Sequence, residues 1–330
     1  MARTPSSPEP PPPAESGTAG TQPVPPVPEI SDYDQFGAYQ ALAADAGSGD
    51  ADGRWAFGTG FADSLTEAGA PVPDGVDGAD LAAYCLMLGD DALIMSHRLQ
   101  QWVTGAPELE DEVALANIAL DLLGQARLLL GRAGVADGTG RGEDAYAFFR
   151  PEHEFRNVRL AELERGDFGE LIARLVVFST WRLALLERLD GSRDPVLSAV
   201  AAKGVKEVAY HRDYAAQWLV RLGDGTAYSR DRAQAGLEAV WPYVPEMFTS
   251  HDVERRLAES GVAVDPPAVR AEFDDVLAAA TDAAGLRIPD AAPRAGVAGR
   301  AGRHGVHTEA MGYLLAELQS VARAHPDATW

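Results

Sequence analysis

Apolar residues recur at intervals of three and four from Leu81 to Leu222, which is the period of an amphipathic α-helix. Strand signals are scarce, because no convincing alternating run is closed by an Asn-Gly or Asp-Gly turn. The chain is therefore predicted to be all-α. The periodic stretches predict four long helices, over Leu81–Trp102, Glu108–Arg132, Phe168–Leu189 and Pro195–Leu222.

The connections between these helices indicate how the helices pack. Short turns, "TGAP" and "DGSRDP", join the first pair and the second pair, whereas a long link runs from Arg132 to Phe168. Short turns favour antiparallel neighbours, and a bundle with one long crossover has the arrangement of ferritin-like folds. Residues 131–144, within this link, and 285–306 are predicted to be irregular. The sequence thus predicts a ferritin-like helical bundle with additional C-terminal helices.

These additional helices follow the four long ones. One spans about Arg232–Phe248 and contains Pro242, which should kink or end it. The stretches "TSHDVERRLAES" and "DPPAVRAEFDDVLAAATDAAG" predict two more helices. A last helix is predicted to run from Thr308, a candidate N-cap, to about Ala324.

Residues 1–77 have a composition that does not suit a folded core. Ten of the 22 prolines fall in the first 30 residues, and the rest of the segment is rich in Gly, Ala, Asp and Ser. Such segments cannot bury enough apolar surface to offset the entropy lost on ordering. We therefore predict a disordered Pro/Gly/Ala-rich acidic extension over 1–77 and one domain over 78–330, long enough to bury a sizeable core.

The net charge and the absence of targeting signals narrow the class of protein. The formal net charge is −22. An acidic chain repels phosphate backbones and anionic lipids, which argues against partners among nucleic acids and membranes. No signal-peptide pattern opens the sequence, and no 18 consecutive residues are apolar. A cytoplasmic protein is the expectation.

A helical bundle raises the question of a carboxylate-bridged di-iron site, because such bundles can hold two metals between four helices. The ligands are a Glu from each of two helices and a Glu-x-x-His pair from each of the other two. Residues three apart share one helical face, so each pair can reach one metal. Thiolate ligation is excluded, since the one cysteine, Cys85, lies among apolar residues and is predicted to be a buried, inert thiol.

The expected Glu-x-x-His pairs are broken in the second and fourth predicted helices. In the second helix Asp121 could be a ligand, but Gly124 stands where the histidine should be. In the fourth helix Glu207 is followed three residues later by Tyr210, and His211 is one position late. Because residues four apart also share a face, Glu207 and His211 alone could still hold a metal.

The other two helices are equally poor in ligands. The third has no Asp, Glu or His between Glu170 and Glu187, and the first offers Asp90 and His97, seven residues apart. A complete di-iron site is therefore not expected. Two interpretations stay open for the candidate residues: buried polar groups that satisfy one another, and a partial metal site.

The irregular stretch near the C-terminus concentrates positive charge within an acidic chain. Arg294, Arg300, Arg303 and His304 lie within "RAGVAGRAGRH". One interpretation is a contact for an anionic group on a ligand or partner, and the other is a solvated flexible loop. The glycines do not form a dinucleotide-binding fingerprint, since they do not open a βαβ unit.

Several long blocks of the sequence resemble one family. The stretches "LGDDALIMSHRLQQWVTGAPELEDEVALANIALDLLGQARLLL", "SRDPVLSAVAAKGVKEVAYHRDYAAQWLVRLGDGT" and "GRHGVHTEAMGYLLAELQSVARAHPDATW" closely resemble the C subunits (PaaC) of the ring 1,2-phenylacetyl-CoA epoxidase. The similarity runs almost continuously from about Leu81 to Trp330. The resemblance implies a ferritin-like fold and a part in a multicomponent oxygenase that epoxidises the ring of phenylacetyl-CoA in aerobic phenylacetate degradation.

The resemblance also implies partners and cofactors. In that family the di-iron site belongs to the A subunit, and the C subunit is a related bundle without a functional site that stabilises the A subunit. A reductase component with flavin and an iron–sulfur cluster supplies electrons from NADPH. The expected function is thus a non-catalytic structural subunit of a hetero-oligomer, with no catalytic, cofactor-binding or metal-binding residues of its own. The alternatives are a self-sufficient metal-dependent oxygenase or oxidase with an incomplete ligand set, and an acyl-CoA-binding protein that uses the Arg-rich loop.

Overall fold

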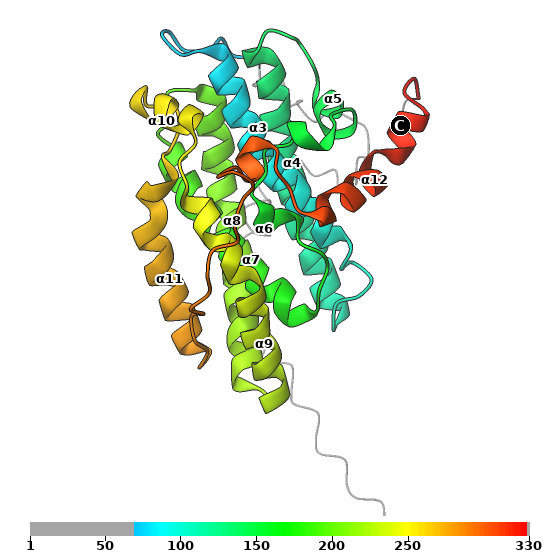
Figure 1. Ribbon diagram of the computed structural model, residues 1–330, viewed down its shortest axis with the longest axis vertical. Helices are drawn as coiled ribbons and strands as arrows, with labels where there is room; N and C mark the ends of the chain where they lie inside the picture. Colours follow the sequence, from blue (N-terminus) through cyan, green and yellow to red (C-terminus); the bar gives the residue numbers. More distant parts are fainter. Residues whose placement is uncertain (1–68, 329–330) are drawn as a thin grey trace, which may run out of the picture. The chain divides into compact units, whose positions relative to one another are not determined.

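Four long helices form two antiparallel hairpins in the computed structural model, which describes residues 69–328. The first two helices pair with each other, as do the last two, and the second packs on the fourth to join the hairpins (Figure 1). No strand is present within residues 69–328, which confirms the all-α prediction. The four helices are α3 (Gly78–Gln100), α4 (Leu109–Ala136), α7 (Phe168–Leu189) and α8 (Pro195–Asp224).

Shorter helices surround these four (Figure 1). The link between α4 and α7 contains two α-helices and one 3-10 helix, labelled η: α5 (Glu143–Phe148), η2 (Glu152–Glu154) and α6 (Arg159–Glu162). The C-terminal part supplies the rest: α9 (Ala227–Val240), η3 (Trp241–Phe248), α10 (Asp252–Glu259), η4 (Pro266–Val269), α11 (Arg270–Ala283), η5 (Gly302–His304) and α12 (Glu309–Ala324).

Aspartate N-caps set where three of the long helices begin. The Asp77 carboxylate accepts from the first amides of α3, Asp167 accepts from Glu170 N at 2.9 Å, and Asp194 accepts from Val196 N and Leu197 N. Each cap satisfies amides that have no partner within the helix. The α8 start is reinforced by Pro195, which is favoured in the first turn.

Helix α7 is enclosed on nearly all sides. Of its 22 residues, 18 are buried, so its surface is covered by neighbours rather than by water. It packs against α8, α9 and α11. The crossing with α9 is close because glycine stands on both helices: a Cβ at Gly236 would lie 2.7 Å from the Gly169 carbonyl oxygen. This enclosure explains why α7 reads as an apolar run almost without polar faces.

Helix α4 is buried on one side only. Leu109, Val113 and Leu120 are 70%, 52% and 61% exposed, whereas its opposite face packs on α3 and α8. By length and composition α4 could also cross a membrane, but half of its most apolar 18-residue window is buried inside the bundle. Half-buried core helices can have the same length and composition, so these properties do not show that α4 spans a membrane.

One predicted boundary is wrong in the link, whereas the expected effect of Pro242 after α8 is confirmed. The stretch 131–144 is not wholly irregular, because α4 continues to Ala136 and α5 begins at Glu143. The buried residues Ala133 and Ala136 extend the apolar face of α4 past the glycines. The helix expected over Arg232–Phe248 divides into α9, which ends before Pro242, and the 3-10 helix η3, as the loss of a proline amide requires.

Two further expectations need correction near the chain ends. The composition assigns residues 70–76 to the extension, yet Ala70, Val72 and Val76 pack against the core, so the folded part begins earlier than residue 78. The prediction of disorder over 1–68 lies outside the described residues. Thr308 does precede α12 as its N-cap, but its side chain makes no capping hydrogen bond.

Candidate functional site

A chain of hydrogen bonds crosses the centre of the bundle and links four helices. The Arg182 guanidinium on α7 donates from Nε to Gln125 Oε1 on α4 at 2.9 Å, and from Nη1 to the Leu88 carbonyl oxygen on α3 at 3.3 Å. Gln125 Nε2 in turn donates to Glu207 Oε2 on α8 at 2.9 Å. These side chains occupy the space into which metal-binding four-helix bundles direct their ligands.

Arg182 places a positive charge in this interior. The residue is 1% exposed, and burial lowers the pKa of its guanidinium to about 10, so the group stays protonated at neutral pH. Among the described residues, Arg182 Nη2 has no hydrogen-bond partner. Gly204 on α8 makes room for the chain, because a Cβ there would lie 2.9 Å from Leu186 Cδ1 and 3.4 Å from Gln125 Nε2.

A second polar contact joins α4 and α8 nearer the surface. His211 Nε2 lies 3.0 Å from Asp121 Oδ2, and the His211 side chain is 1% exposed while that of Asp121 is 36% exposed. One turn earlier on α8, Glu207 Oε1 lies 3.3 Å from Nζ of Lys203, whose side chain is 71% exposed. Lys206 is exposed on the same helix. Asp121, Glu207 and His211 are therefore each engaged in a polar contact.

The two positions at which a di-iron site would need histidine do not complete a ligand set. A Cβ added at Gly124 would have no heavy atom within 4 Å, so this position borders open space. Tyr210 is 39% exposed and meets the His211 ring edge-on, with ring centroids 6.5 Å apart. Neither position points to a packed metal-binding interior.

No group of three metal ligands forms elsewhere in the described residues. Across residues 69–328, no three His, Cys, Asp or Glu side chains gather closely enough to hold a metal ion. His97 is half-buried in the last turn of α3, two turns beyond Asp90, and burial lowers the pKa of its imidazole. Cys85 is buried, which raises the pKa of its thiol. The side chains present do not fit a di-metal centre.

Two buried aspartates on α3 bind other segments of the chain instead. The Asp90 carboxylate pairs with the Arg150 guanidinium and accepts from Arg156 N at 2.8 Å. The Asp91 carboxylate accepts from both terminal nitrogens of Arg303, at 3.0 and 2.8 Å. Asp90 was a candidate ligand and Arg303 a candidate ligand contact, but both are committed to buried ion pairs. Removing one partner of such a pair leaves an uncompensated charge.

A third buried pair fixes the entry to α12. His307 Nδ1 lies 2.7 Å from Glu162 Oε2, and His307 Nε2 lies 3.1 Å from the Phe155 carbonyl oxygen. Because both ring nitrogens face acceptors, both can donate only when the ring is protonated, so these contacts favour the imidazolium form. Burial acts to lower the pKa of His307, but the Glu162 carboxylate outweighs it and raises that pKa. Glu162 also accepts a hydrogen bond from the Thr308 amide.

The remaining members of the Arg-rich loop lie at a cavity. Arg294 lines this cavity with His304, whose ring packs against that of His251 at a centroid distance of 4.8 Å and an interplanar angle of 52°. Arg300 is exposed nearby and donates to the His304 carbonyl oxygen at 3.4 Å. The loop is ordered by a tight turn, in which Val297 and Arg300 exchange backbone hydrogen bonds of 3.0 Å. The alternative of a solvated flexible loop therefore does not describe this segment, which forms a defined turn.

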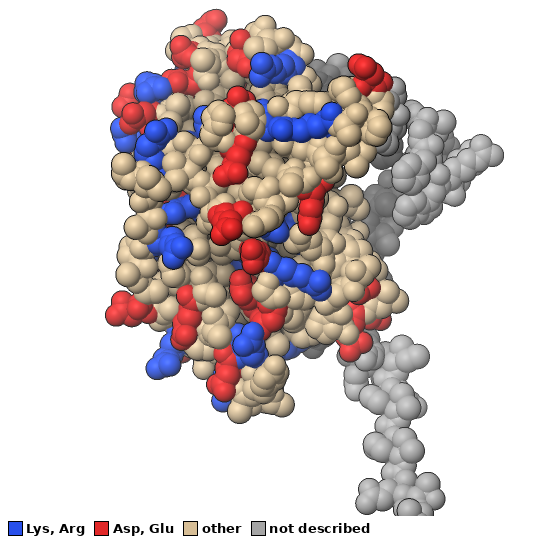
Figure 2. Space-filling model, turned by 45° about the vertical axis from the view of Figure 1, so that its right-hand side comes forward, with Lys and Arg blue, Asp and Glu red and all other residues tan. Residues whose placement is uncertain are grey.

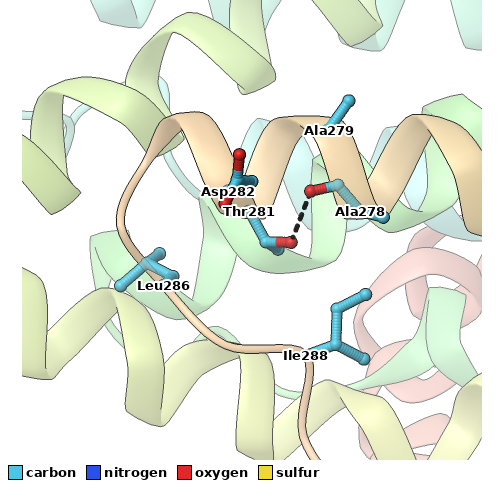
Figure 3. Close-up of a pocket in the computed structure, with 6 residues that line it drawn as sticks. All are labelled: Ala278, Ala279, Thr281, Asp282, Leu286 and Ile288. Atoms are coloured by element: carbon cyan, nitrogen blue, oxygen red, sulfur yellow. Dashed lines mark hydrogen bonds between the residues drawn. The ribbon is translucent and has the colours of Figure 1, made fainter.

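A second hollow, of about 500 Å³, opens between α11 and the segment that follows it (Figure 3). Its hydroxyl, on Thr281, already donates to the Leu277 and Ala278 carbonyl oxygens at 2.8 and 3.1 Å. The rest of the lining is small or apolar apart from one carboxylate, so no set of converging polar groups marks it as a reaction site. The lining residues are Ala278, Ala279, Thr281, Asp282, Leu286 and Ile288.

The structure adds residues that the pattern of metal ligands does not reach. Arg182 interrupts the apolar run of α7 and is visible in the sequence, but a di-iron ligand set calls for Asp, Glu and His rather than Arg. Asp91 adjoins Asp90 and is equally visible, yet its partner Arg303 lies 212 residues away. Glu162 and His307 carry no local signal that would pair them.

Comparisons with known proteins identify the family to which this chain belongs. Residues 67–330 match the family model described as phenylacetic acid catabolic protein. The chain is also 43% identical, over 251 residues, to the C subunit of 1,2-phenylacetyl-CoA epoxidase from Escherichia coli (strain K12); the match covers 76% of this chain and 99% of that protein. The helical bundle with one long crossover is the ferritin-like fold of this family. The chain belongs to the phenylacetic acid catabolic protein family.

Proposed function

We propose that this chain is a non-catalytic structural subunit of the multicomponent 1,2-phenylacetyl-CoA epoxidase, which stabilises the di-iron catalytic A subunit in aerobic phenylacetate degradation. The observation that supports this most directly is Arg182 at the centre of the bundle, hydrogen-bonded to Gln125 and to the Leu88 carbonyl oxygen. A fixed cation repels metal ions at short range, and its side chain fills the space that ligands would need.

The proposal assigns the chemistry to other components. The di-iron centre would belong to the A subunit, and NADPH, flavin and an iron–sulfur cluster to the reductase. This chain would work in the cytoplasm within a hetero-oligomer. In keeping with this, Figure 2 shows Lys and Arg interspersed with Asp and Glu on the face in view, rather than gathered into the basic field that nucleic acid or anionic lipid requires.

The outer face of α4 is the surface we assign to the contact with the A subunit. Leu109, Val113 and Leu120 are spaced so that all three lie along one side of the helix, and each is more than half exposed. Rows of exposed apolar side chains mark protein contacts. The half-exposed Asp121, paired with His211, adds a polar edge to this face. A chain that works as one of several subunits needs such a face.

The test compares activity with assembly in the complete epoxidase. Glu207→Ala combined with His211→Ala removes the two α8 side chains closest to a metal-ligand pattern. We expect the assembled complex to retain its epoxidation rate per unit of complex recovered, because these residues serve packing. Folding is controlled by circular dichroism and by co-purification with the A subunit, since lost pairing at a buried histidine can cost about 1–3 kcal/mol.

Two outcomes would contradict the proposal. A well-folded, fully assembled double variant with turnover reduced about a hundredfold, some 2.7 kcal/mol in activation free energy, would mean that this chain takes part in the chemistry. Stoichiometric iron in the purified chain alone, with an oxo-bridge absorption band, would favour the self-sufficient metal-dependent oxygenase instead.

A further inference from the structure

A cavity of about 180 Å³ lies where the Arg-rich loop meets η3 and the start of α10. It is smaller than the roughly 300–1,000 Å³ of sites that enclose whole small molecules. Three arginines and two histidines contribute to its lining, with one carboxylate, and these come from four separate segments of the chain: Arg159, Glu246, His251, Arg294, Arg303 and His304. The cavity therefore suits a single charged group rather than an entire ligand.

Two of these arginines are already neutralised within the protein. Arg159 Nε donates to Glu246 Oε2 at 2.6 Å, and its terminal nitrogens donate to carbonyl oxygens of the loop. Arg303 is held by the Asp91 carboxylate. Glu246, the carboxylate in the lining, also accepts from Gly302 N at 3.0 Å. These contacts build the walls and leave no carboxylate free to neutralise another cation.

The other cationic groups keep their hydrogen-bonding capacity. In the described part of the chain, neither the Arg294 side chain nor the His304 ring forms a hydrogen bond or ion pair, and the His304 ring contacts that of His251. His251 Nδ1 accepts from Val253 N at 3.2 Å, so the neutral ring carries its proton on Nε2. The cavity thus holds one unpaired guanidinium and two imidazoles with unused nitrogens.

We propose that this cavity binds one phosphate group of a small anionic ligand, with Arg294 supplying the charge and the imidazoles of His251 and His304 supplying hydrogen bonds. An anion fits because every unpaired group in the lining is a donor or can become one. Burial lowers the pKa of His304, and the positive charges of nearby Arg300 and Arg156 lower it further. The carboxylates of Asp252 and Glu246 oppose this shift. A bound phosphate would relieve that repulsion.

A metal ion is the competing occupant and fits poorly. Two imidazoles could serve as ligands, but the one lining carboxylate is engaged by Arg159 and Gly302 N, and no third donor joins them within residues 69–328. The positive charge of Arg294 would also repel a cation. The inference concerns this cavity alone and does not depend on the proposed function.

The experiment titrates the full chain with inorganic phosphate at ionic strength held constant with chloride, and follows binding by calorimetry and by the histidine NMR signals. The test variant is Arg294→Gln with His304→Gln, two side chains whose loss removes no hydrogen bond or ion pair within the described fold and one ring contact, that of His304 with His251. The matched control is Arg287→Gln, an exposed arginine of the same connecting segment that does not line the cavity. We expect saturable binding that weakens at least about tenfold in the test variant and less than about twofold in the control.

Parallel titrations with coenzyme A and with dephospho-coenzyme A identify the source of the phosphate. Tighter binding of coenzyme A than of its dephospho form would assign the site to a nucleotide 3′-phosphate. If coenzyme A binds no more tightly than inorganic phosphate, the site is assigned to the free ion. Absence of saturable binding by all three, or equal weakening in the test and control variants, would overturn the proposal. Unchanged circular dichroism of each variant shows that the comparison reports on the site.

Discussion

Helices α7 and α4 are both rich in leucine, yet the rest of the chain covers them to different extents. Buried residues make up 18 of the 22 positions of α7, and even its Arg174 and Arg182 are enclosed. On α4, by contrast, Leu109, Val113 and Leu120 remain more than half exposed. Helices α9 and α11 and the C-terminal segment cover α7, whereas the outer face of α4 has no cover among the described residues.

The difference separates two uses of the same kind of residue. Apolar side chains on α7 stabilise this chain itself, because their burial is complete without a partner. The apolar side chains on the outer face of α4 contribute little to the folding of this chain, because they stay in water. They would be buried only when another protein binds this face. Stability and assembly should therefore respond to substitutions in different helices.

A pair of leucine substitutions tests this separation most strongly. Leu175→Ala on α7 removes a side chain that is fully buried, and should lower the free energy of unfolding by about 2–5 kcal/mol. Leu120→Ala on α4 removes the same atoms from an exposed position and should change it by less than about 0.5 kcal/mol. Urea-induced unfolding followed by circular dichroism measures both.

The same two variants should give the opposite order in assembly. Leu120→Ala should weaken co-purification with the A subunit, whereas Leu175→Ala, at a temperature where it remains folded, should not. If both leave the complex intact, the α4 face is not the contact; if Leu120→Ala unfolds the chain, α4 is more enclosed than the structure shows.

A pair of cation substitutions sharpens the comparison at the centre of the bundle. Arg182→Met keeps the volume of a buried side chain but leaves Gln125 and the Leu88 carbonyl oxygen without their donor, and should cost about 1.5–3 kcal/mol. Lys203→Met removes the exposed ammonium group that pairs with Glu207. This change should lower the free energy of unfolding by no more than about 0.5 kcal/mol. Thermal unfolding at one ionic strength compares them. Equal costs would show that the interior position of Arg182 is energetically unimportant.

The cover over α7 should loosen as the pH rises. The Arg303 guanidinium lies 5.8 Å from the centre of the Trp181 ring on α7, and the same segment is tied down by His307 and Glu162. The pKa of His307 is raised above its ordinary 6.5. A raised pKa means that the pair contributes fully below about pH 6.5 and that this contribution is lost as the pH rises through the folded pKa.

Urea unfolding of the wild type and of His307→Asn between pH 6 and pH 9 measures this effect. We expect the stability difference between the two proteins to be larger at pH 6 than at pH 9. A difference that is constant over this range would show that His307 does not titrate with folding.

Local sequence signals predicted the helices well and the connections between them poorly. The bounds of α7 came out as predicted because Asp167 caps one end and the "DGSRDP" turn closes the other, both within a few residues. Helical periodicity placed Asp121 and His211 on the correct helices, but their 3.0 Å contact between α4 and α8 could not be predicted from it. Irregular segments gave no comparable signal, so the extent of α4 and the docking of residues 70–76 were missed.

The long-range ion pairs could not be predicted in the same way. Asp90 and Asp91 are adjacent, yet their arginine partners lie 60 and 212 residues further along the chain. Nothing in the spacing of a single sequence links such positions, because the fold alone brings them together. Asp90 therefore resembles a metal ligand in the sequence, whereas in the structure a guanidinium satisfies its buried carboxylate.

Lys203 and Lys206 make one region of α8 selectively reactive toward amine-directed reagents. They are the two lysines of the whole sequence, against 26 arginines, and both are exposed on α8. Amine-reactive cross-linkers and labels can therefore attach only there or at the N-terminal amine. Since Glu207, one turn from Lys203, touches α4 through Gln125, a mass-spectrometric cross-link from either lysine to another subunit would locate that subunit beside the α4–α8 face without any engineered residue.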